Sequence, residues 1–191
     1  NRRVAPQLES LTTDLPEQIA YADLRERIEN ADQPLLMRLF LEYLPLTFSR
    51  RHGDPSRPWN QFSIDVLNEG NEKRLAFAGN WRDIFQNWEA LSISIPGYID
   101  NMICKFVSAT TADGYNPYRI TRDGIDWEKP EPENPWANIG YWGDHQVIYL
   151  SKLIELAQSH FPNGLDALLA QDVFAYANVP YRIAGFDNLL A

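Results

Sequence analysis

Residues 79–91 read GNWRDIFQNWEAL, and this stretch decides the fold class. Its large apolar side chains recur at helical spacing: Trp81, Ile84, Phe85 and Trp88. This spacing predicts a helix over residues 81–92 with a buried aromatic face. Asn80 and Asp83 match an N-cap followed by an acidic residue in the first turn, where the helix dipole favours negative charge. Asp83 also falls on the opposite face of the helix, which either lines a cavity or meets water.

Further segments repeat apolar residues at the helical period. They span about residues 14–30, 34–44, 96–107 and 144–158, with a short continuation over 165–169. The first two are interpreted as an antiparallel pair, with Asp14 as the first N-cap and Pro16 in the first turn. Residues 144–158 are apolar around most of the helix circumference, which predicts deep burial. The pattern therefore predicts a mainly α protein of paired antiparallel helices joined by long loops.

The connections between these segments are long and rich in turn residues. Residues 48–60 contain two prolines and a glycine, so no helix continues through them. Residues 110–143 form a long irregular stretch that is rich in proline and tryptophan. Connections of that length are usually functional or disordered, and the aromatic content argues against disorder. Residues 62–66 and 74–77 predict a small β-hairpin, and residues 172–176 predict a short strand.

Composition narrows the classes of protein. The 191 residues carry a net charge of −9, which argues against a nucleic-acid partner, because phosphate binding needs a surplus of Lys and Arg. The single cysteine, Cys104, excludes an internal disulfide and fits a small buried side chain better than a reactive thiol. No apolar run approaches the roughly 20 residues that span a bilayer, and no signal-peptide pattern opens the chain. A reducing, cytoplasmic location is expected.

Metal and cofactor signatures do not occur in the sequence. His52, His145 and His160 show no metal-ligand spacing with one another or with Cys104, so no metal site is expected. Neither a Gly-x-Gly-x-x-Gly fingerprint, a Walker-type loop nor a Gly-x-Ser-x-Gly elbow is found, and no cofactor is expected. The chain starts without Met and ends without a polar tail, so residues 1–191 are expected to be either one helical domain or a fragment of a larger one.

Three parts of the sequence mix aromatic rings with carboxylates, arginines and amides. They are residues 51–60, residues 79–89, and residues 113–119 together with 140–146. Saccharides suit that mixture, because rings stack on their C–H faces while charged and amide groups hydrogen-bond their hydroxyls. Each part also has a structural interpretation. Trp81 and Trp88 fit a core, Asp83 and Asp144 fit N-caps, and Asp54 before a proline fits a turn.

These three parts, and most of residues 35–160 with them, resemble a group of large bacterial proteins. Those proteins are distantly similar to cellobiose-phosphorylase-like enzymes and other glycosidases built on an (α/α)6 toroid. The resemblance implies that the paired helices are hairpins of a toroid, of which this chain holds a part. It also implies catalytic carboxylates on loops at one end of the ring. Asp83 and Asp144 are its positional candidates, with Asp54 and Glu128 behind them.

The resemblance further implies a carbohydrate-active protein that acts on glycosidic bonds, either a glycoside phosphorylase or hydrolase-like. A phosphorylase needs one general acid and uses phosphate as nucleophile, whereas an inverting hydrolase needs a second carboxylate roughly 6.5–9.5 Å away. Arg82, Arg119 and His145 are candidates for holding phosphate. The alternative is a non-catalytic helical scaffold or carbohydrate-binding module, in which Asp83 and Asp144 only cap helices.

We therefore expect Asp83 and Asp144 to supply acid/base chemistry. The other candidates are expected to bind an oligosaccharide or glycoside: Asp54, Trp59, Asn60, Arg82, Asn116, Tyr118, Arg119, Trp127, Glu128, Trp136, Tyr141, Trp142 and His145. Inorganic phosphate is a further expected partner if the reaction is phosphorolysis. Self-association is expected because an isolated part of a toroid exposes core faces. Neither a nucleic acid nor a membrane is an expected partner.

Overall fold

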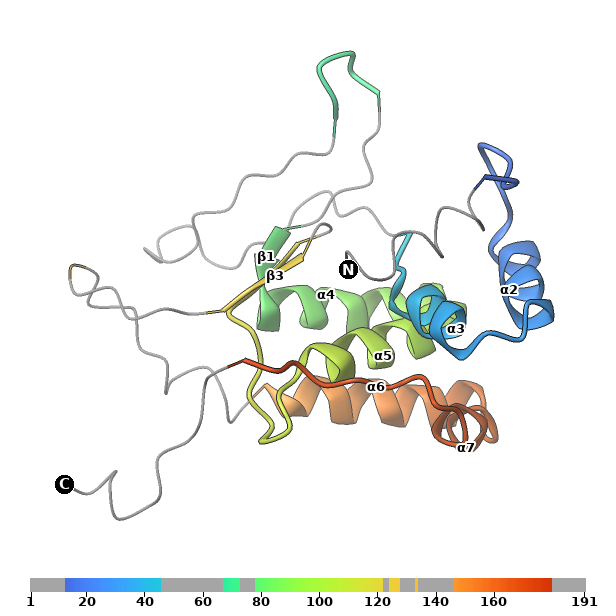
Figure 1. Cartoon of the computed structure of the whole chain (residues 1–191). Coiled ribbons are helices and arrows are strands. Elements are labelled where there is room, and N and C mark those ends of the chain that lie inside the picture. The colour runs from blue at the N-terminus through green and yellow to red at the C-terminus, as the bar shows by residue number, and fades with distance from the viewer. Residues whose placement is uncertain are drawn as a thin grey trace.

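The computed structural model describes residues 13–45, 67–72, 78–121, 124–127, 133 and 146–179. Its elements, in chain order, are α2 (Tyr21–Asn30), α3 (Pro34–Glu42), β1 (Ala78–Asn80), α4 (Trp81–Ser94), the 3-10 turn η1 (Pro96–Tyr98), α5 (Ile99–Ala109), β2 (Arg119–Thr121), β3 (Gly124–Asp126), α6 (Val147–His160) and α7 (Gly164–Leu169). The described part is mostly helical, with one small sheet (Figure 1). The mainly α prediction is thereby confirmed.

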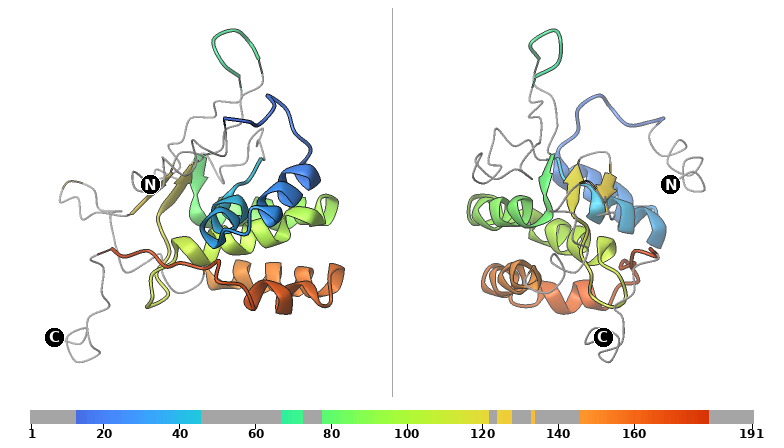
Figure 2. Two further views of the ribbon diagram at one scale, coloured as in Figure 1. Left: turned by 45° about the vertical axis from the view of Figure 1, so that its right-hand side comes forward. Right: turned by 90° about the vertical axis from the view of Figure 1, so that its left-hand side faces the viewer.

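Three helices form the centre of the molecule. α6 packs against both α4 and α5, and α3 packs on α5 from another side. η1 turns the chain back between α4 and α5, so these two helices run in opposite directions (Figures 1 and 2). The beginning of α4, the end of α5 and the beginning of α6 therefore lie at the same end, beside the sheet. We call this the sheet end, and the end that holds η1 the far end.

The sheet covers the start of α4. Its strand order is β1-β2-β3, and both pairs are antiparallel. The backbone N–H of Trp81, the first residue of α4, donates to Tyr118 O at 3.0 Å. The first N–H groups of a helix have no partner inside the helix. This bond satisfies one of them and holds α4 to the sheet.

An aromatic cluster lies between α4 and α5. Trp81, Phe85 and Trp88 lie along α4, and Phe106 meets them from α5. The centroid of the Phe85 ring lies 4.8 Å from those of Trp88 and Phe106, and both pairs meet edge to face. Such pairs contribute about 0.5–1.5 kcal/mol each beyond the area that they bury. All four rings are buried, so the prediction of a core role for the two tryptophans is confirmed.

A buried amide ties three helices together at the far end. Asn101, in the first turn of α5, donates through Nδ2 to Phe40 O at 3.1 Å and to Tyr43 O at 2.9 Å. Its Oδ1 accepts a hydrogen bond from the Tyr21 hydroxyl at 2.5 Å. Because α3 ends at Glu42, these carbonyls lie at the end of the helix, where the Tyr43 N–H also donates to Phe40 O at 3.0 Å and the amide adds a further donor to each. The Asn101 side chain is therefore fully used in holding α2 and α3 on α5.

Two features of the first helical pair differ from the sequence prediction. α2 begins at Tyr21 with Ala20 at the N-cap, so Asp14 does not cap this helix and Pro16 does not lie in its first turn. The Tyr21 ring stacks on Phe40 at 5.1 Å and meets Tyr98 edge to face at 4.6 Å, measured between centroids. These tertiary contacts, rather than the polar residues upstream, determine where the helix starts.

α6 is less buried than its apolar sequence predicts. Only Leu153 and Ala157 are buried along it, whereas Val147 is 52% and Ile148 is 53% exposed. The prediction of deep burial was wrong, because α4, α5 and α7 cover only part of the helix surface. The N-cap is Gln146. Asp144, for which both a capping and a ligand-facing role were considered, lies outside the described residues.

The remaining differences concern strands. The stretch 110–143, predicted to be irregular, contains β2 and β3. Residues 172–176, predicted to be a strand, pair with no strand in the described part. They lie beside the end of α5 instead. Ala175 N–H donates to Ser108 Oγ at 3.3 Å, and Ala177 N–H donates to Thr110 O at 2.9 Å. The predicted hairpin over residues 62–66 and 74–77 lies outside the described residues.

Candidate functional site

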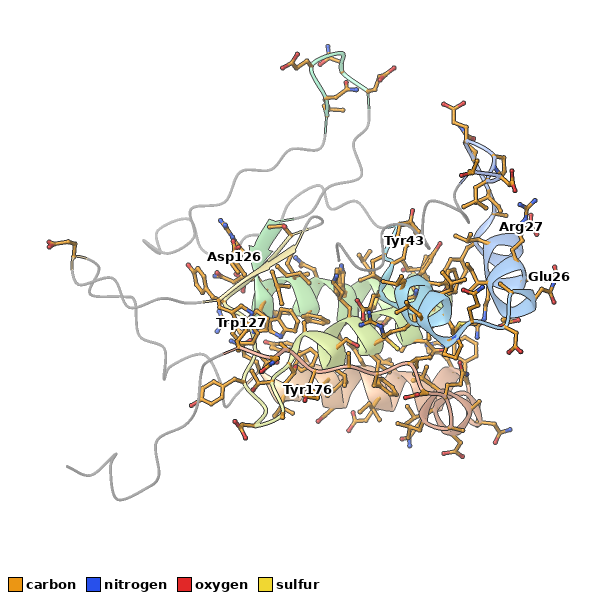
Figure 3. The ribbon with its side chains drawn as sticks, viewed as in Figure 1. Glu26, Arg27, Tyr43, Asp126, Trp127 and Tyr176 are labelled. Carbon is orange, nitrogen blue, oxygen red and sulfur yellow. The ribbon has the colours of Figure 1, made fainter. Side chains whose placement is uncertain are left out.

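The sheet brings separate candidate residues together. Antiparallel pairing places Asn80 of β1 beside Arg119 of β2, and Arg119 opposite Asp126 of β3. Tyr118 directly precedes β2, and its N–H donates to Asp126 O at 3.0 Å. Trp127 follows β3, and Figure 3 places it with Asp126 at the sheet end, away from α2. Asn80 and residues 38 to 47 positions further along the sequence therefore share one end of the molecule.

A buried carboxylate lies in the first turn of α4. Asp83 is the one charged residue that is buried in the described part of the chain. Its Oδ1 lies 3.5 Å from Arg82 Nε. The positive end of the α4 dipole also favours a negative charge at this position. Asn80 occupies the N-cap, as predicted, but its side chain makes no capping hydrogen bond.

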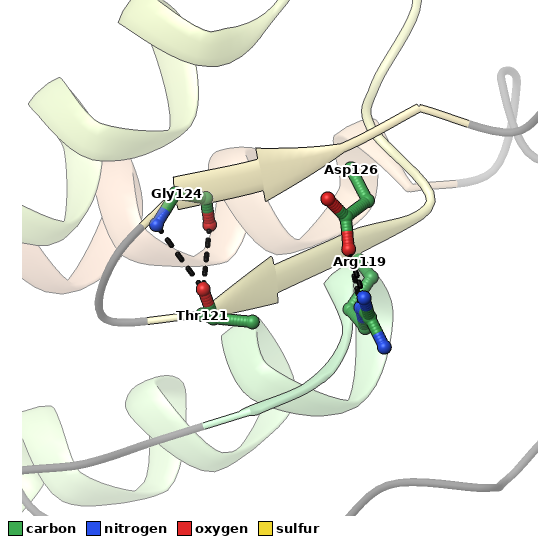
Figure 4. Close-up of polar contacts among 4 residues, drawn as sticks. All are labelled: Arg119, Thr121, Gly124 and Asp126. Carbon is green, nitrogen blue, oxygen red and sulfur yellow. Dashed lines mark hydrogen bonds and ion pairs between the residues drawn. The ribbon is translucent and has the colours of Figure 1, made fainter.

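An ion pair joins β2, the central strand, to β3 (Figure 4). Arg119 donates through Nε to Asp126 Oδ2 at 2.6 Å and also through Nη2 to the same oxygen. The turn between the strands is closed by Thr121, whose Oγ1 accepts from Gly124 N and donates to Gly124 O, each at 3.1 Å. Both partners of the ion pair are exposed, so it contributes no more than about 1 kcal/mol to stability.

Asn116 is buried between the end of α5 and the start of β2. Thr110 Oγ1 donates to Asn116 Oδ1 at 2.9 Å, and the same hydroxyl lies 2.8 Å from Phe106 O. The Asn116 side chain is thereby held against the end of α5. Its Nδ2 has no hydrogen-bond partner among the residues that the structure describes.

Gln146 shares these properties at the start of α6. Its side chain is 1% exposed, and neither Nε2 nor Oε1 has a hydrogen-bond partner in the described part of the chain. Trp81 Nε1, at the start of α4, is likewise buried without a partner there. The sheet end thus holds buried donors and an acceptor that its described residues do not satisfy. Gln146 was not among the predicted site residues. The sequence feature that could have indicated it is a polar residue directly before an apolar helix and directly after two predicted site residues, Asp144 and His145.

The structure places six of the sequence-predicted site residues at the sheet end: Arg82, Asp83, Asn116, Tyr118, Arg119 and Trp127. The other candidates lie outside the described residues: Asp54, Trp59, Asn60, Glu128, Trp136, Tyr141, Trp142, Asp144 and His145. In the described ranges, no group of three His, Cys, Asp or Glu side chains could hold a metal ion.

A concave region lies away from these residues. A cavity of about 370 Å³ opens between the corner that joins α2 to α3 and the segment after α7. Carboxylates and amides line it with some apolar side chains: Ile28, Glu29, Asp32, Gln33, Pro34, Met37, Gln171, Asp172 and Val173. Most of these side chains are exposed, and none was predicted as a site residue.

The side chains with shifted pKa values lie on α2, η1 and the first part of α5, away from the sheet end. Burial raises the pKa of the Tyr21 hydroxyl to about 12, and this effect outweighs the nearby Arg25 and the hydrogen bond to Asn101. Burial, assisted by Asp100, raises the pKa of the Cys104 thiol to about 12. A thiol with such a pKa is protonated at neutral pH and is a poor nucleophile, which agrees with the predicted structural role of Cys104.

Comparison with known proteins gives one match. Residues 1–45 match the family model described as glycoside hydrolase family 149 insertion domain 1. This segment includes α2 and α3, whereas α4 to α7 and the sheet lie outside it. No curated protein matches the chain. The match gives the chain a glycoside hydrolase family context through an insertion domain. None of the described helices is long and apolar enough to cross a membrane.

Proposed function

We propose that the chain is part of a carbohydrate-active protein that acts on glycosidic bonds, and that its sheet end faces the saccharide. One observation carries this proposal. The six described site candidates, predicted from separate stretches, lie at the sheet end beside buried polar atoms without partners among the described residues. The family context of residues 1–45 supports the same class of substrate.

The proposed chemistry centres on Asp83. Its carboxylate is buried beside Arg82 at the start of a helix, in the kind of enclosed position that general acids occupy. Asp144 is the proposed second carboxylate in a hydrolase. In a phosphorylase, inorganic phosphate takes the place of the activated water, and Arg82, Arg119 and His145 are the proposed phosphate contacts.

The proposed architecture is part of an (α/α) toroid. The opposed directions of α4 and α5, joined by the short η1, support a helical hairpin of the kind that such rings repeat. In this proposal Trp59, Trp127, Trp136, Tyr141 and Trp142 are the aromatic platforms for sugar rings. The proposed partners are an oligosaccharide or glycoside, and a second copy of the chain through exposed apolar side chains of α6.

A second candidate function is a non-catalytic accessory module. The matched model is an insertion domain, and α3 packs directly on α5, so the matched segment shares its core with the rest of the described chain. In this candidate the sheet end binds a saccharide for a catalytic centre elsewhere, and Asp83 only stabilises the start of α4.

Product release from an oligosaccharide panel tests the proposal, with and without inorganic phosphate. A sugar phosphate that forms only with phosphate identifies a phosphorylase, and free sugar in both conditions identifies a hydrolase. Asp83→Asn is expected to lower turnover by roughly 100-fold or more, because general acids contribute that much. Asp172→Asn, an exposed carboxylate at the far end, is the matched control and should be fully active. Binding without turnover by the wild-type chain supports the accessory module, and the absence of both contradicts the proposed function.

A further inference from the structure

Gln146 presents an unusual buried amide. The side chain is 1% exposed, yet neither its donor nor its acceptor has a partner among the described residues. Leaving a buried polar group without a hydrogen bond costs about 1–3 kcal/mol, and the large majority of buried polar atoms in native proteins are paired. Glutamine at this position therefore needs an explanation other than stability of the described fold.

Helix capping does not supply that explanation. Gln146 occupies the N-cap of α6, but its side chain makes no capping hydrogen bond. Ser, Thr, Asp and Asn are the side chains that cap well. An apolar side chain of the same length would fill the same space and leave no unsatisfied atoms. Buried polar residues that break this local rule are expected at functional sites.

The position of Gln146 agrees with such a site. α6 packs against α4 and α5, so its start lies at the sheet end with the starts of α4 and β2. Asn116 Nδ2 and Trp81 Nε1 are further buried donors at this end without partners in the described part. The residues directly before Gln146 in the sequence include three of the predicted saccharide contacts, Tyr141, Trp142 and His145, and the predicted catalytic residue Asp144.

The chemistry of the amide selects the class of ligand. A primary amide offers a donor and an acceptor side by side. An anion would satisfy only Nε2, and a cation only Oε1. Adjacent hydroxyl groups satisfy both atoms at once, because each hydroxyl can donate and accept. We infer that Gln146 is a saccharide-binding residue that hydrogen-bonds neighbouring hydroxyls of the ligand; this inference rests on the proposed function and assigns it a new contact.

Gln146→Met tests this inference, because methionine keeps the length of the side chain and removes both polar atoms. Binding is measured by calorimetry with a panel of gluco-, xylo- and manno-oligosaccharides, and stability by thermal unfolding. The variant should unfold at the same or a higher temperature and bind the recognised oligosaccharide roughly tenfold or more weakly, the loss expected for one good hydrogen-bonding residue. Gln171→Met, an exposed glutamine after α7, is the control and should change neither quantity.

Different failures have different meanings. If the wild-type chain binds a saccharide and Gln146→Met binds it equally well, this inference is wrong while the proposed function stands. A lower unfolding temperature of the variant with unchanged affinity would show that the amide is held by the protein itself, and would also overturn the inference. If the wild-type chain binds no saccharide on the panel, the proposed function fails first, and the inference fails with it.

Discussion

Asn101 and Gln146 are both buried amides, and they lie at opposite ends of the same helical bundle. Asn101 is 0% exposed and makes three hydrogen bonds, to Phe40, Tyr43 and Tyr21. Gln146 is 1% exposed and makes none with the described residues. The two residues carry the same functional group at the same depth, so their different bonding reflects what each end of the molecule does.

The far end satisfies its buried amide from within. The three partners of Asn101 come from α2, the last turn of α3 and the residue just after it, so the amide joins segments that would otherwise pack through apolar contacts alone. A satisfied buried amide of this kind specifies one arrangement of its neighbours. The sheet end instead leaves donors and an acceptor available. The comparison teaches that buried polar groups join the elements of the fold at the far end, whereas at the sheet end they lack partners among the described residues, where we propose that a ligand binds.

Replacing Asn101 by Leu removes all three hydrogen bonds of the far-end amide and should have the largest effect on stability. Phe40 O loses one of its two donors, Tyr43 O loses the Asn101 donor and the Tyr21 hydroxyl loses its acceptor, so we expect the free energy of unfolding to fall by about 3 kcal/mol. Urea denaturation followed by circular dichroism measures the change. Gln146→Leu is the matched variant, and it should not destabilise the chain. Equal losses in the two variants would erase the distinction between the ends.

Replacing Tyr21 by Phe removes one of the three bonds and keeps the ring contacts with Phe40 and Tyr98. The expected loss is about 1 kcal/mol at neutral pH, the typical net value of one hydrogen bond. If the Tyr21→Phe variant is instead more stable than the wild type, the hydrogen bond between Tyr21 and Asn101 does not stabilise the fold.

The difference in stability between the wild type and Tyr21→Phe should depend on pH. The pKa of Tyr21 is raised from 10.0 to about 12 in the folded chain, mainly by burial. Its contribution to stability is therefore complete below pH 10 and lost as the pH rises towards 12. The wild type should lose more stability over this range than Tyr21→Phe does. Cys104, whose pKa is also raised, contributes equally to both proteins and cancels in the difference.

The smallest effect on stability is expected at the sheet end itself. Arg119→Gln removes the ion pair with Asp126, and because both partners are exposed we expect a loss of less than about 1 kcal/mol. Affinity for a bound oligosaccharide should fall by more than this, since Arg119 is a proposed ligand contact. Loss of stability without loss of affinity would assign Arg119 to the sheet alone.

The sequence predicted the central helices well and the sheet poorly. α4 and α5 follow from apolar side chains repeated at helical spacing, which form a core wherever the helices meet. β2 and β3 are three residues long, too short to show an alternating pattern, and they depend on pairing with each other and with β1. The length of α6 was predicted approximately, but its burial was not, because the number of neighbouring helices cannot be inferred from one helix.

The candidate site shows a similar division. Arg82, Asp83, Asn116, Tyr118, Arg119 and Trp127 were predicted from the composition of their segments, and the paired strands bring these segments to one end. The three hydrogen bonds of the Asn101 side chain could not be predicted, because its partners lie far from it in the sequence. Gln146 was missed as a ligand contact, since an unpartnered buried atom becomes visible only in three dimensions.

The central claim is that the sheet end, and not the far end, binds a saccharide. The most direct measurement follows the side-chain amide resonances of Gln146 and Asn101 by two-dimensional nitrogen–proton NMR while an oligosaccharide is titrated into the chain. The Gln146 resonances should move with the same dissociation constant as overall binding, and those of Asn101 should stay in place. Saturable binding that shifts Asn101 and leaves Gln146 unchanged would contradict the account.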